Sequence, residues 1–140
     1  MRQHNLSSVR SRNTKPELFI RSGLHALGFR FRLHCTSILG RPDLVFKSRK
    51  VAIFVHGCFW HCHQCHDFRW PKNRSEWWKK KLLGNRKRDQ RVQSVLNEQG
   101  WRFSVVWECA VKHGESEEIF NLLQSWLLHG KGNLEIELGK

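Results

Sequence analysis

The feature that most constrains this chain is a run of histidine and cysteine, HGCFWHCHQCH, at residues 56–66. It holds four histidines and three cysteines within eleven positions and has no helical or strand period. Such a segment is held by something other than a hydrophobic core, and a bound metal is the obvious candidate. Together with the more distant Cys109 it predicts a structural zinc site, because tetrahedral zinc takes four thiolate or imidazole ligands.

Residue types alone leave the zinc ligand set open. Six residues carry suitable donor atoms: Cys58, Cys62, His63, Cys65, His66 and Cys109. The alternative is that they are free thiols and surface histidines.

The wider sequence indicates a reducing compartment. No apolar run is long enough to span a bilayer, and the N-terminus lacks the apolar stretch of a signal peptide, so we expect a cytoplasmic protein. Thiols stay reduced there, and the odd number of cysteines, five, agrees with metal ligands or buried thiols rather than disulfides.

The charge balance indicates an anionic partner. Lys and Arg total 25 against 12 Asp and Glu, which gives a formal net charge of +13. Nucleic acid is the default inference, although a solvated basic surface is the alternative. At 140 residues we expect one domain, 1–140, with a basic N-terminal arm over 1–13.

Hydrophobic periodicity and turn residues predict a mixed sheet flanked by helices. Thr14-Lys15-Pro16-Glu17 is a capping box that begins a helix over 15–27. The other predicted elements are a strand at 29–33, a hairpin of buried strands at 43–47 and 51–55, helices near 75–83 and 85–99, a strand at 101–107 and a helix near 116–128. Residues 130–140 are expected to be an irregular tail.

The hairpin suggests a second metal site. If its turn centres on Arg49, paired residue numbers sum to 98, which places Asp43 opposite Val55. A carboxylate beside the main-chain carbonyl of Val55 makes a two-point oxygen site open to water and phosphate, which suits Mg²⁺. The equal alternative is that Asp43 is a turn residue after Pro42.

Two histidines and two aromatic pairs lie beyond that strand. His56 and His61 could transfer a proton near a metal-bound phosphate, or ligate zinc, and spacing does not separate the two. Phe59-Trp60 lies inside the Cys/His run, and Trp77-Trp78 precedes Lys79, Lys80 and Lys81, as base stacking requires. The alternative is core packing, which we expect for Trp101, Trp107 and Trp126.

Several motifs occur together in order: NTKPE (13–17), GRPDLVF (40–46), VHGCFWH (55–61), Cys65, EWW (76–78), N-x-x-RD (85–89) and GW…VVWECA (100–110). Over about residues 6–112 the chain resembles the very-short-patch repair (Vsr) DNA mismatch endonucleases. The resemblance implies a restriction endonuclease-like fold with a structural zinc site. It implies nicking of one strand of double-stranded DNA on the 5′ side of the thymine in T:G mismatches left by deamination of 5-methylcytosine. It also implies a bacterial, nucleoid-associated monomer that works with repair proteins.

The resemblance assigns catalytic roles to individual residues. Asp43 and the carbonyl of Val55, which replaces a threonine of the best-known members, would bind Mg²⁺, and Glu17 would approach the metal through water. His61 would carry out acid/base work, with His56 close by and Asp89 as the residue that orients it.

The resemblance also selects zinc ligands and DNA contacts. The zinc ligands would be Cys58, His63, Cys65 and Cys109, which leaves Cys62 and His66 as spectators. Phe59, Trp60 and Trp78 would form an aromatic wedge beside the mismatch, and Leu6 would enter from the minor groove.

Two other functions compete with this interpretation. One is a restriction-type or mobile-element endonuclease that cuts intact duplex at a specific sequence on the same scaffold. The other is a non-enzymatic zinc module that only binds nucleic acid. The bases that flank a mismatch are not readable from the sequence, since a few side chains read them.

Overall fold

The computed structural model describes residues 12–138 of the chain, so the predicted minor-groove contact at Leu6 and most of the N-terminal arm lie outside it. Five strands form one sheet in the order β1-β2-β3-β4-β5. The elements are α1 (Lys15–Ala26), β1 (Arg32–Leu33), β2 (Leu44–Phe46), β3 (Val51–His56), α2 (Ser75–Glu98), β4 (Arg102–Trp107), α3 (Glu108–His113), α4 (Ser116–His129) and β5 (Leu134–Ile136). None of the helices in this part of the chain is both long and apolar enough to cross a membrane.

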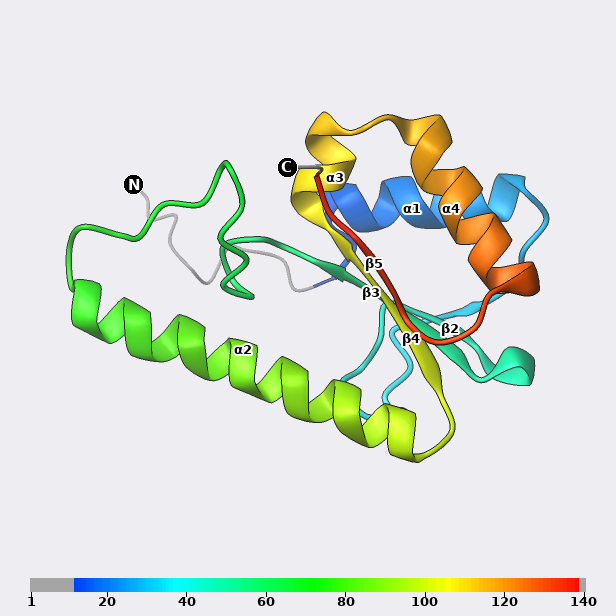
Figure 1. Ribbon diagram of the computed structural model, residues 1–140, viewed down its shortest axis with the longest axis horizontal. Helices are drawn as coiled ribbons and strands as arrows, with labels where there is room; N and C mark the ends of the chain where they lie inside the picture. The colour runs from blue at the N-terminus through cyan, green and yellow to red at the C-terminus, as the bar shows by residue number, and fades with distance from the viewer. Residues whose placement is uncertain (1–11, 139–140) are drawn as a thin grey trace.

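The sheet is mixed and covered on both faces, as predicted. β1 and β2, and β2 and β3, pair antiparallel, whereas β3, β4 and β5 run parallel. Figure 1 shows α1, α3 and α4 on one side of the sheet and the long α2 on the other. The expected architecture of a mixed sheet flanked by helices is therefore confirmed.

Strand β3 divides its side chains between two cores with a period of two. Val51 and Ile53 pack with Leu24 of α1 and Leu123 of α4 in one apolar cluster. Ala52 and Phe54 pack with Leu96 of α2 in the other, together with Val105 of β4. His56 continues this second series, so the alternation points its ring toward α2.

The hairpin exists, but its register differs by one residue from the prediction. Leu44 pairs with Ile53 and Phe46 with Val51, so paired numbers sum to 97 rather than 98. The cause is the turn, a 3₁₀ turn at Lys47–Arg49 followed by Lys50 in the left-handed region, which makes a four-residue connection. Continuing this register aligns Asp43 with Phe54 rather than with Val55.

The predicted helix break near residue 84 is absent, and α2 is one helix of 24 residues. Gly84 lies inside it, exposed, with nothing within 4 Å of the position its Cβ would occupy. A solvent-facing glycine weakens a helix by about 1 kcal/mol without ending it, and packing on β4 compensates.

The prediction of an irregular C-terminal tail over residues 130–140 was wrong in part. Residues Leu134–Ile136 form β5, which pairs parallel with β4, and Ile136 is buried in the core. The helix α3, directly after β4, was also missed. By contrast the predicted strand at 29–33 shrinks to β1, because Phe29 and Phe31 pack against Phe46 without entering the ladder.

Candidate metal centres and histidine pair

Four of the six candidate zinc ligands come together beyond the ends of β3 and β4. The donor atoms of Cys58, His63, Cys65 and Cys109 all lie within 4.8 Å of one another. Nδ1 of His63 is 3.4 Å from Sγ of Cys58 and 3.8 Å from Sγ of Cys109. The parallel register of β3 and β4 explains why these residues come together. His56 pairs with Trp107, so both strands end at the same level and the segments that follow them begin side by side.

The other two candidates lie apart from this group within residues 12–138. Cys62 is buried, but its Sγ faces Nε2 of Gln64 at 4.0 Å. His66 is exposed, with Nδ1 3.7 Å from a carboxylate oxygen of Asp67.

The chemistry of the four-residue group fits a soft cation. Burial raises the pKa of Cys58 and of Cys109. The charge of a neighbouring cysteine raises each pKa further, although hydrogen bonds partly offset the rise. Neutral thiols packed together gain little, whereas a divalent ion stabilises the thiolates it binds. Three sulfurs and one imidazole nitrogen form a donor set that suits zinc.

A second cluster joins β3, the loop after it and α2. Because a carboxylate only accepts, Nδ1–H of His61 donates to Oδ2 of Asp89, over 2.6 Å. The rings of His56 and His61 stack, with centroids 3.7 Å apart and planes 2° apart. The structure thus brings together three residues that the resemblance groups in one site.

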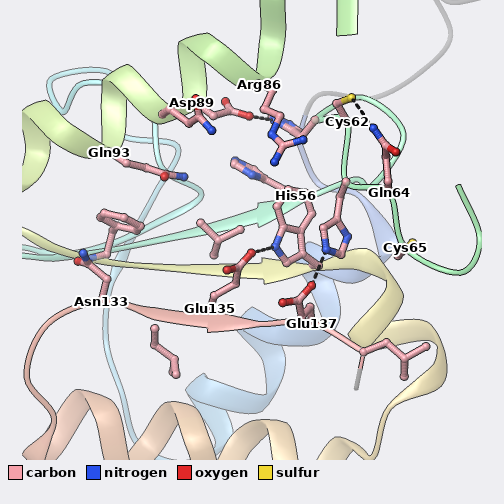
Figure 2. Close-up of a pocket in the computed structure, with 18 of the residues that line it drawn as sticks. His56, Cys62, Gln64, Cys65, Arg86, Asp89, Gln93, Asn133, Glu135 and Glu137 are labelled. Atoms are coloured by element: carbon pink, nitrogen blue, oxygen red, sulfur yellow. Dashed lines mark hydrogen bonds and ion pairs between the residues drawn. The ribbon is translucent and has the colours of Figure 1, made fainter. Parts of the chain in front are cut away.

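His56 is held neutral at this place. Its side chain is 7% exposed, and Nδ1 has no hydrogen-bond partner among the described residues. Burial, and then the nearby His61, lowers the pKa of His56 well below its usual value. Figure 2 shows His56 and Asp89 at a cavity of about 1070 Å³ between α2 and the strands β4 and β5.

A third cluster surrounds Asp43, at the start of β2. Oδ2 of Asp43 accepts the main-chain N–H of Val55 at 2.7 Å. The pairing of β2 with β3 ends at Leu44 and Ile53, two residues before Val55. Carboxylate oxygens of Asp43 and Glu17 and a ring nitrogen of His34 lie within 4.8 Å of one another. Asp43 and Val55 are therefore neighbours, as expected. The carboxylate of Asp43 contacts the main-chain N–H of Val55, and the shifted register means that the two residues are not directly opposite each other.

The carboxyl group of Asp43 is buried beside a second acidic side chain, that of Glu17. Burial, and then the charge of Glu17, raises the pKa of Asp43 to about 7, although the Val55 N–H partly offsets this. A carboxyl group of this kind gains from a divalent ion that replaces its proton. Oxygen donors next to an open strand end fit magnesium.

Glu17 is fixed by several partners and is 1% exposed. Thr14 Oγ1 accepts the Glu17 N–H at 3.3 Å, which confirms half of the capping box. The return bond goes to N–H of Asn13 at 2.8 Å instead of to Thr14. Arg21 and His34 both donate to the other carboxylate oxygen, Oε2, at 2.9 and 2.7 Å. His34 was not among the predicted site residues, because a single histidine after a short strand gives no signal in the sequence.

The predicted wedge aromatics pack against each other where the Cys/His loop meets the start of α2. The ring of Phe59 lies 5.1 Å from that of Trp60 and 5.4 Å from that of Trp78. Asn85 donates to the Trp60 carbonyl at 2.9 Å and so ties this loop to α2. Trp77 is different, because it is 45% exposed and covered on its ring by Arg74 at 4.9 Å.

The expected core tryptophans are placed as predicted. Trp107 and Trp126 are buried, and the half-buried Trp101 packs against the cluster on the α2 side of the sheet.

Fold and site together define a basic α/β protein in which a Cys₃His group that could hold a metal, a carboxylate cluster and a stacked histidine pair lie near one end of the central strands. Comparison with known proteins narrows this class, and the chain belongs to the Vsr family of DNA mismatch endonucleases. The family model for DNA mismatch endonuclease Vsr matches residues 1–67.

Relatives support the assignment over most of the chain. The type II nicking enzyme V.XorIIP of Xanthomonas oryzae pv. oryzae is 50% identical over 108 residues, which is 77% of this chain and 79% of that protein. The DNA mismatch endonuclease Vsr of Escherichia coli K12 is 37% identical over 139 residues, which is 97% of this chain and 89% of that protein. The type II nicking enzyme V.NaeI of Lentzea aerocolonigenes is 42% identical over 113 residues, which is 76% of this chain and 67% of that protein.

Proposed function

We propose that the protein is a magnesium-dependent DNA endonuclease on a restriction endonuclease-like scaffold. It nicks one strand of double-stranded DNA on the 5′ side of the thymine at T:G mismatches that arise from deamination of 5-methylcytosine, in very-short-patch repair. Relatives named as nicking enzymes and as a mismatch endonuclease support this proposal. The observation that carries it is the approach of three functional groups within residues 55–61: the Asp43-bound Val55, the buried His56 and the Asp89-bound His61.

Asp43 and the carbonyl of Val55 would hold the ion, and Glu17 would reach it through water. Magnesium there supplies neutralisation of phosphate charge and a lowered pKa for attacking water. Glu17 is well placed for a fixed outer contact, since Arg21 and His34 hold its carboxylate. Asp43 would exchange its proton for the ion, and its raised pKa means that the proton competes with the ion below about pH 7.

His61 is proposed to carry the proton. The bond to Asp89 keeps the hydrogen on Nδ1, so Nε2 presents a lone pair. The neutral ring of His56 stacks on one face of His61 and limits its rotation. The expected products are a 5′-phosphate and a 3′-hydroxyl.

The Cys₃His centre is proposed to be a structural zinc site with Cys58, His63, Cys65 and Cys109 as ligands. Closed four-ligand sites of this composition stabilise a fold rather than catalyse. Loop residues 57–66 carry both His61 and two wedge aromatics, so zinc would position catalysis and recognition together.

Recognition is proposed to use Phe59, Trp60 and Trp78, which would insert beside the mismatch. Mispaired steps are cheaper to unstack than matched ones, and this difference supplies selectivity. Exposed cations on α2 would contact phosphates: Lys79, Lys80, Lys81, Arg86, Lys87 and Arg88. We propose that the protein acts as a monomer and hands the nick to repair proteins.

A nicking assay on end-labelled duplexes tests the proposal. Matched and T:G-containing duplexes of the same sequence are incubated with the protein and Mg²⁺, and the Asp43→Asn variant serves as a control of equal shape. Cleavage of the thymine strand only in the mismatched duplex is expected. Equal cleavage of the matched duplex would indicate a sequence-specific endonuclease, and binding without any cleavage would indicate a non-enzymatic module.

A further inference from the structure

The two residues that follow the last strand, Glu137 and Leu138, contact the Cys₃His centre. Oε1 of Glu137 lies 2.7 Å from Nε2 of His63, and the N–H of Leu138 points at Sγ of Cys109 over 3.5 Å. Figure 2 shows the Glu137 carboxylate joined to this imidazole, with Glu135 directed at the neighbouring indole. Two consecutive residues of the C-terminal segment therefore contact two different candidate zinc ligands.

The pattern of β5 explains how the strand can do this. Glu135 and Glu137 are two residues apart and share one face, while Ile136 between them is buried in the core. Parallel pairing of Ile136 with Val106 fixes this register beside the end of β4. The apolar side chain of Ile136 thus anchors the strand, and the carboxylates of Glu135 and Glu137 line the cavity between α2 and the strands β4 and β5.

The two nitrogens of His63 have different surroundings. Nδ1 faces the sulfurs of Cys58 and Cys109, whereas Nε2 makes its hydrogen bond with the Glu137 carboxylate. A ring nitrogen of His63 and carboxylate oxygens of Glu135 and Glu137 all lie within 4.8 Å of one another. A carboxylate cannot donate, so Nε2 carries the hydrogen and Nδ1 keeps its lone pair for a metal. The carboxylate also makes Nδ1 more basic and therefore a better ligand.

The ring plane of His63 is held as well. It stacks on Trp107 with centroids 4.0 Å apart and planes 10° apart. The indole N–H of Trp107 donates to Glu135 at 2.6 Å. One carboxylate therefore fixes the edge of the imidazole, and the other fixes the ring on which the imidazole rests.

We propose that Glu137 is a positioning residue for the zinc ligand His63, and that residues 137–138, directly after β5, complete the zinc centre without supplying a ligand. This inference rests on the proposed structural zinc site and extends it to the C-terminal strand. The Leu138 N–H adds to it, because a hydrogen bond to a thiolate sulfur stabilises the charge that zinc requires on Cys109. Zinc retention then depends on the C-terminal strand as well as on the four ligands.

Release of zinc to a chromogenic chelator from the full-length protein tests the proposal. Replacement of outer-sphere partners of this kind lowers metal affinity about 10–100-fold, so Glu137→Ala should release zinc roughly that much faster. Glu137→Gln should be intermediate, because its amide oxygen still accepts the Nε2–H but carries no charge. Glu98→Ala, which changes an exposed glutamate at the end of α2, is the control, and it should release zinc at close to the wild-type rate.

A spectroscopic measurement separates positioning from general stability. In ¹⁵N-labelled, zinc-loaded protein the Nε2 proton of His63 should be slow to exchange in the wild type and in Glu98→Ala, and should exchange fast in Glu137→Ala. Equal release rates and equal exchange in the two alanine variants would overturn the inference while leaving the zinc site intact. Wild-type protein that binds no zinc would overturn the zinc site itself. If Glu137→Ala does not fold, Glu137→Gln decides, since its release rate must then exceed that of Glu98→Gln.

Discussion

Asp89 on α2 holds the imidazole of His61 through a 2.6 Å hydrogen bond, although the two residues lie 28 positions apart in the chain. The contact joins the Cys/His loop to α2, and both residues line the cavity between α2 and the strands β4 and β5. It depends on the continuity of α2, because Asp89 lies beyond Gly84, where the sequence had suggested a break. One uninterrupted helix therefore carries Trp78 at its start and Asp89 further along.

The first prediction concerns this pair. His61→Ala should lower the single-turnover nicking rate about 10²–10⁴-fold, the usual contribution of a general acid or base. Asp89→Asn should also be slow, since the amide can stabilise the wrong tautomer, and the double variant should be little worse than His61→Ala because the two act as a unit. His66→Ala, an exposed histidine of the same loop, is the control. Losses that simply multiply in the double variant would contradict the pairing.

The second prediction follows from the raised pKa of Asp43. A carboxyl group whose folded pKa lies near 7, above the usual 3.8, makes ionisation destabilising as pH rises from about 4 through 7. Without metal, Asp43→Asn should therefore be more stable than wild type at pH 8, and the difference should vanish near pH 3. Each pKa unit corresponds to about 1.4 kcal/mol, so a gain of a few kcal/mol is the upper limit. Chemical denaturation of both proteins across this pH range measures the difference.

The second prediction also covers the competition between magnesium and protons at Asp43. Because the ion replaces the proton of Asp43, apparent Mg²⁺ affinity should rise with pH up to about 7 and then level off. The Mg²⁺ concentration for half-maximal nicking, measured between pH 6 and 8.5, tests this. A pH-independent requirement would argue that Asp43 is not the ligand.

The limits of sequence reasoning are clear at this cluster. Asp43 and Val55 could be brought together from the hairpin alone, since two buried strands and a short polar turn leave few registers. The conformation of Lys50 decides between those registers, and a left-handed lysine is not signalled by residue type. The contact of Glu17 with His34 could not be predicted from the sequence for another reason. It joins a helix to the end of a strand, and only tertiary packing brings the two together.

The C-terminal strand shows a different limit. Residues 134–138, LEIEL, do alternate between apolar and acidic side chains, as a strand with one buried face should. The run is short and follows two glycines, and its stability comes from parallel pairing with β4, which is remote in sequence. The outer contact of Glu137 with His63 could be found only once that pairing was known.

The third prediction concerns the thiols. Cys109→Ser should abolish stoichiometric zinc binding and unfold the loop over 57–66, since a four-ligand site loses a ligand. Cys62→Ser should keep zinc, because its sulfur lies apart from the cluster, although burying a hydroxyl there costs about 1–3 kcal/mol. Metal analysis of the purified variants, with thermal unfolding alongside, distinguishes them. Loss of zinc from Cys62→Ser would show that the ligand set is different.

The fourth prediction tests the phosphate contacts. The logarithm of the DNA association constant should fall linearly with the logarithm of the salt concentration, with a slope of about −0.9 for each phosphate neutralised. Replacing Lys80 with Ala should make that slope less steep by about one unit and should weaken matched and mismatched duplexes equally. Fluorescence anisotropy over a range of salt concentrations gives both values. A slope near zero for the wild type would be incompatible with DNA as the partner.

The fifth prediction separates the wedge from its exposed neighbour. Trp78 packs with Phe59 and Trp60, whereas Trp77 beside it is exposed under Arg74, so the two tryptophans offer a matched pair of substitutions. Base–aromatic stacking contributes about 1–3 kcal/mol, so Trp78→Ala should reduce the preference for T:G over matched duplex roughly 5–150-fold. Trp77→Ala should weaken both duplexes alike and leave the preference unchanged. The ratio of the two dissociation constants at one salt concentration is the measurement. If Trp77→Ala removes the preference and Trp78→Ala does not, recognition takes place on the outer face of α2 instead of at the loop.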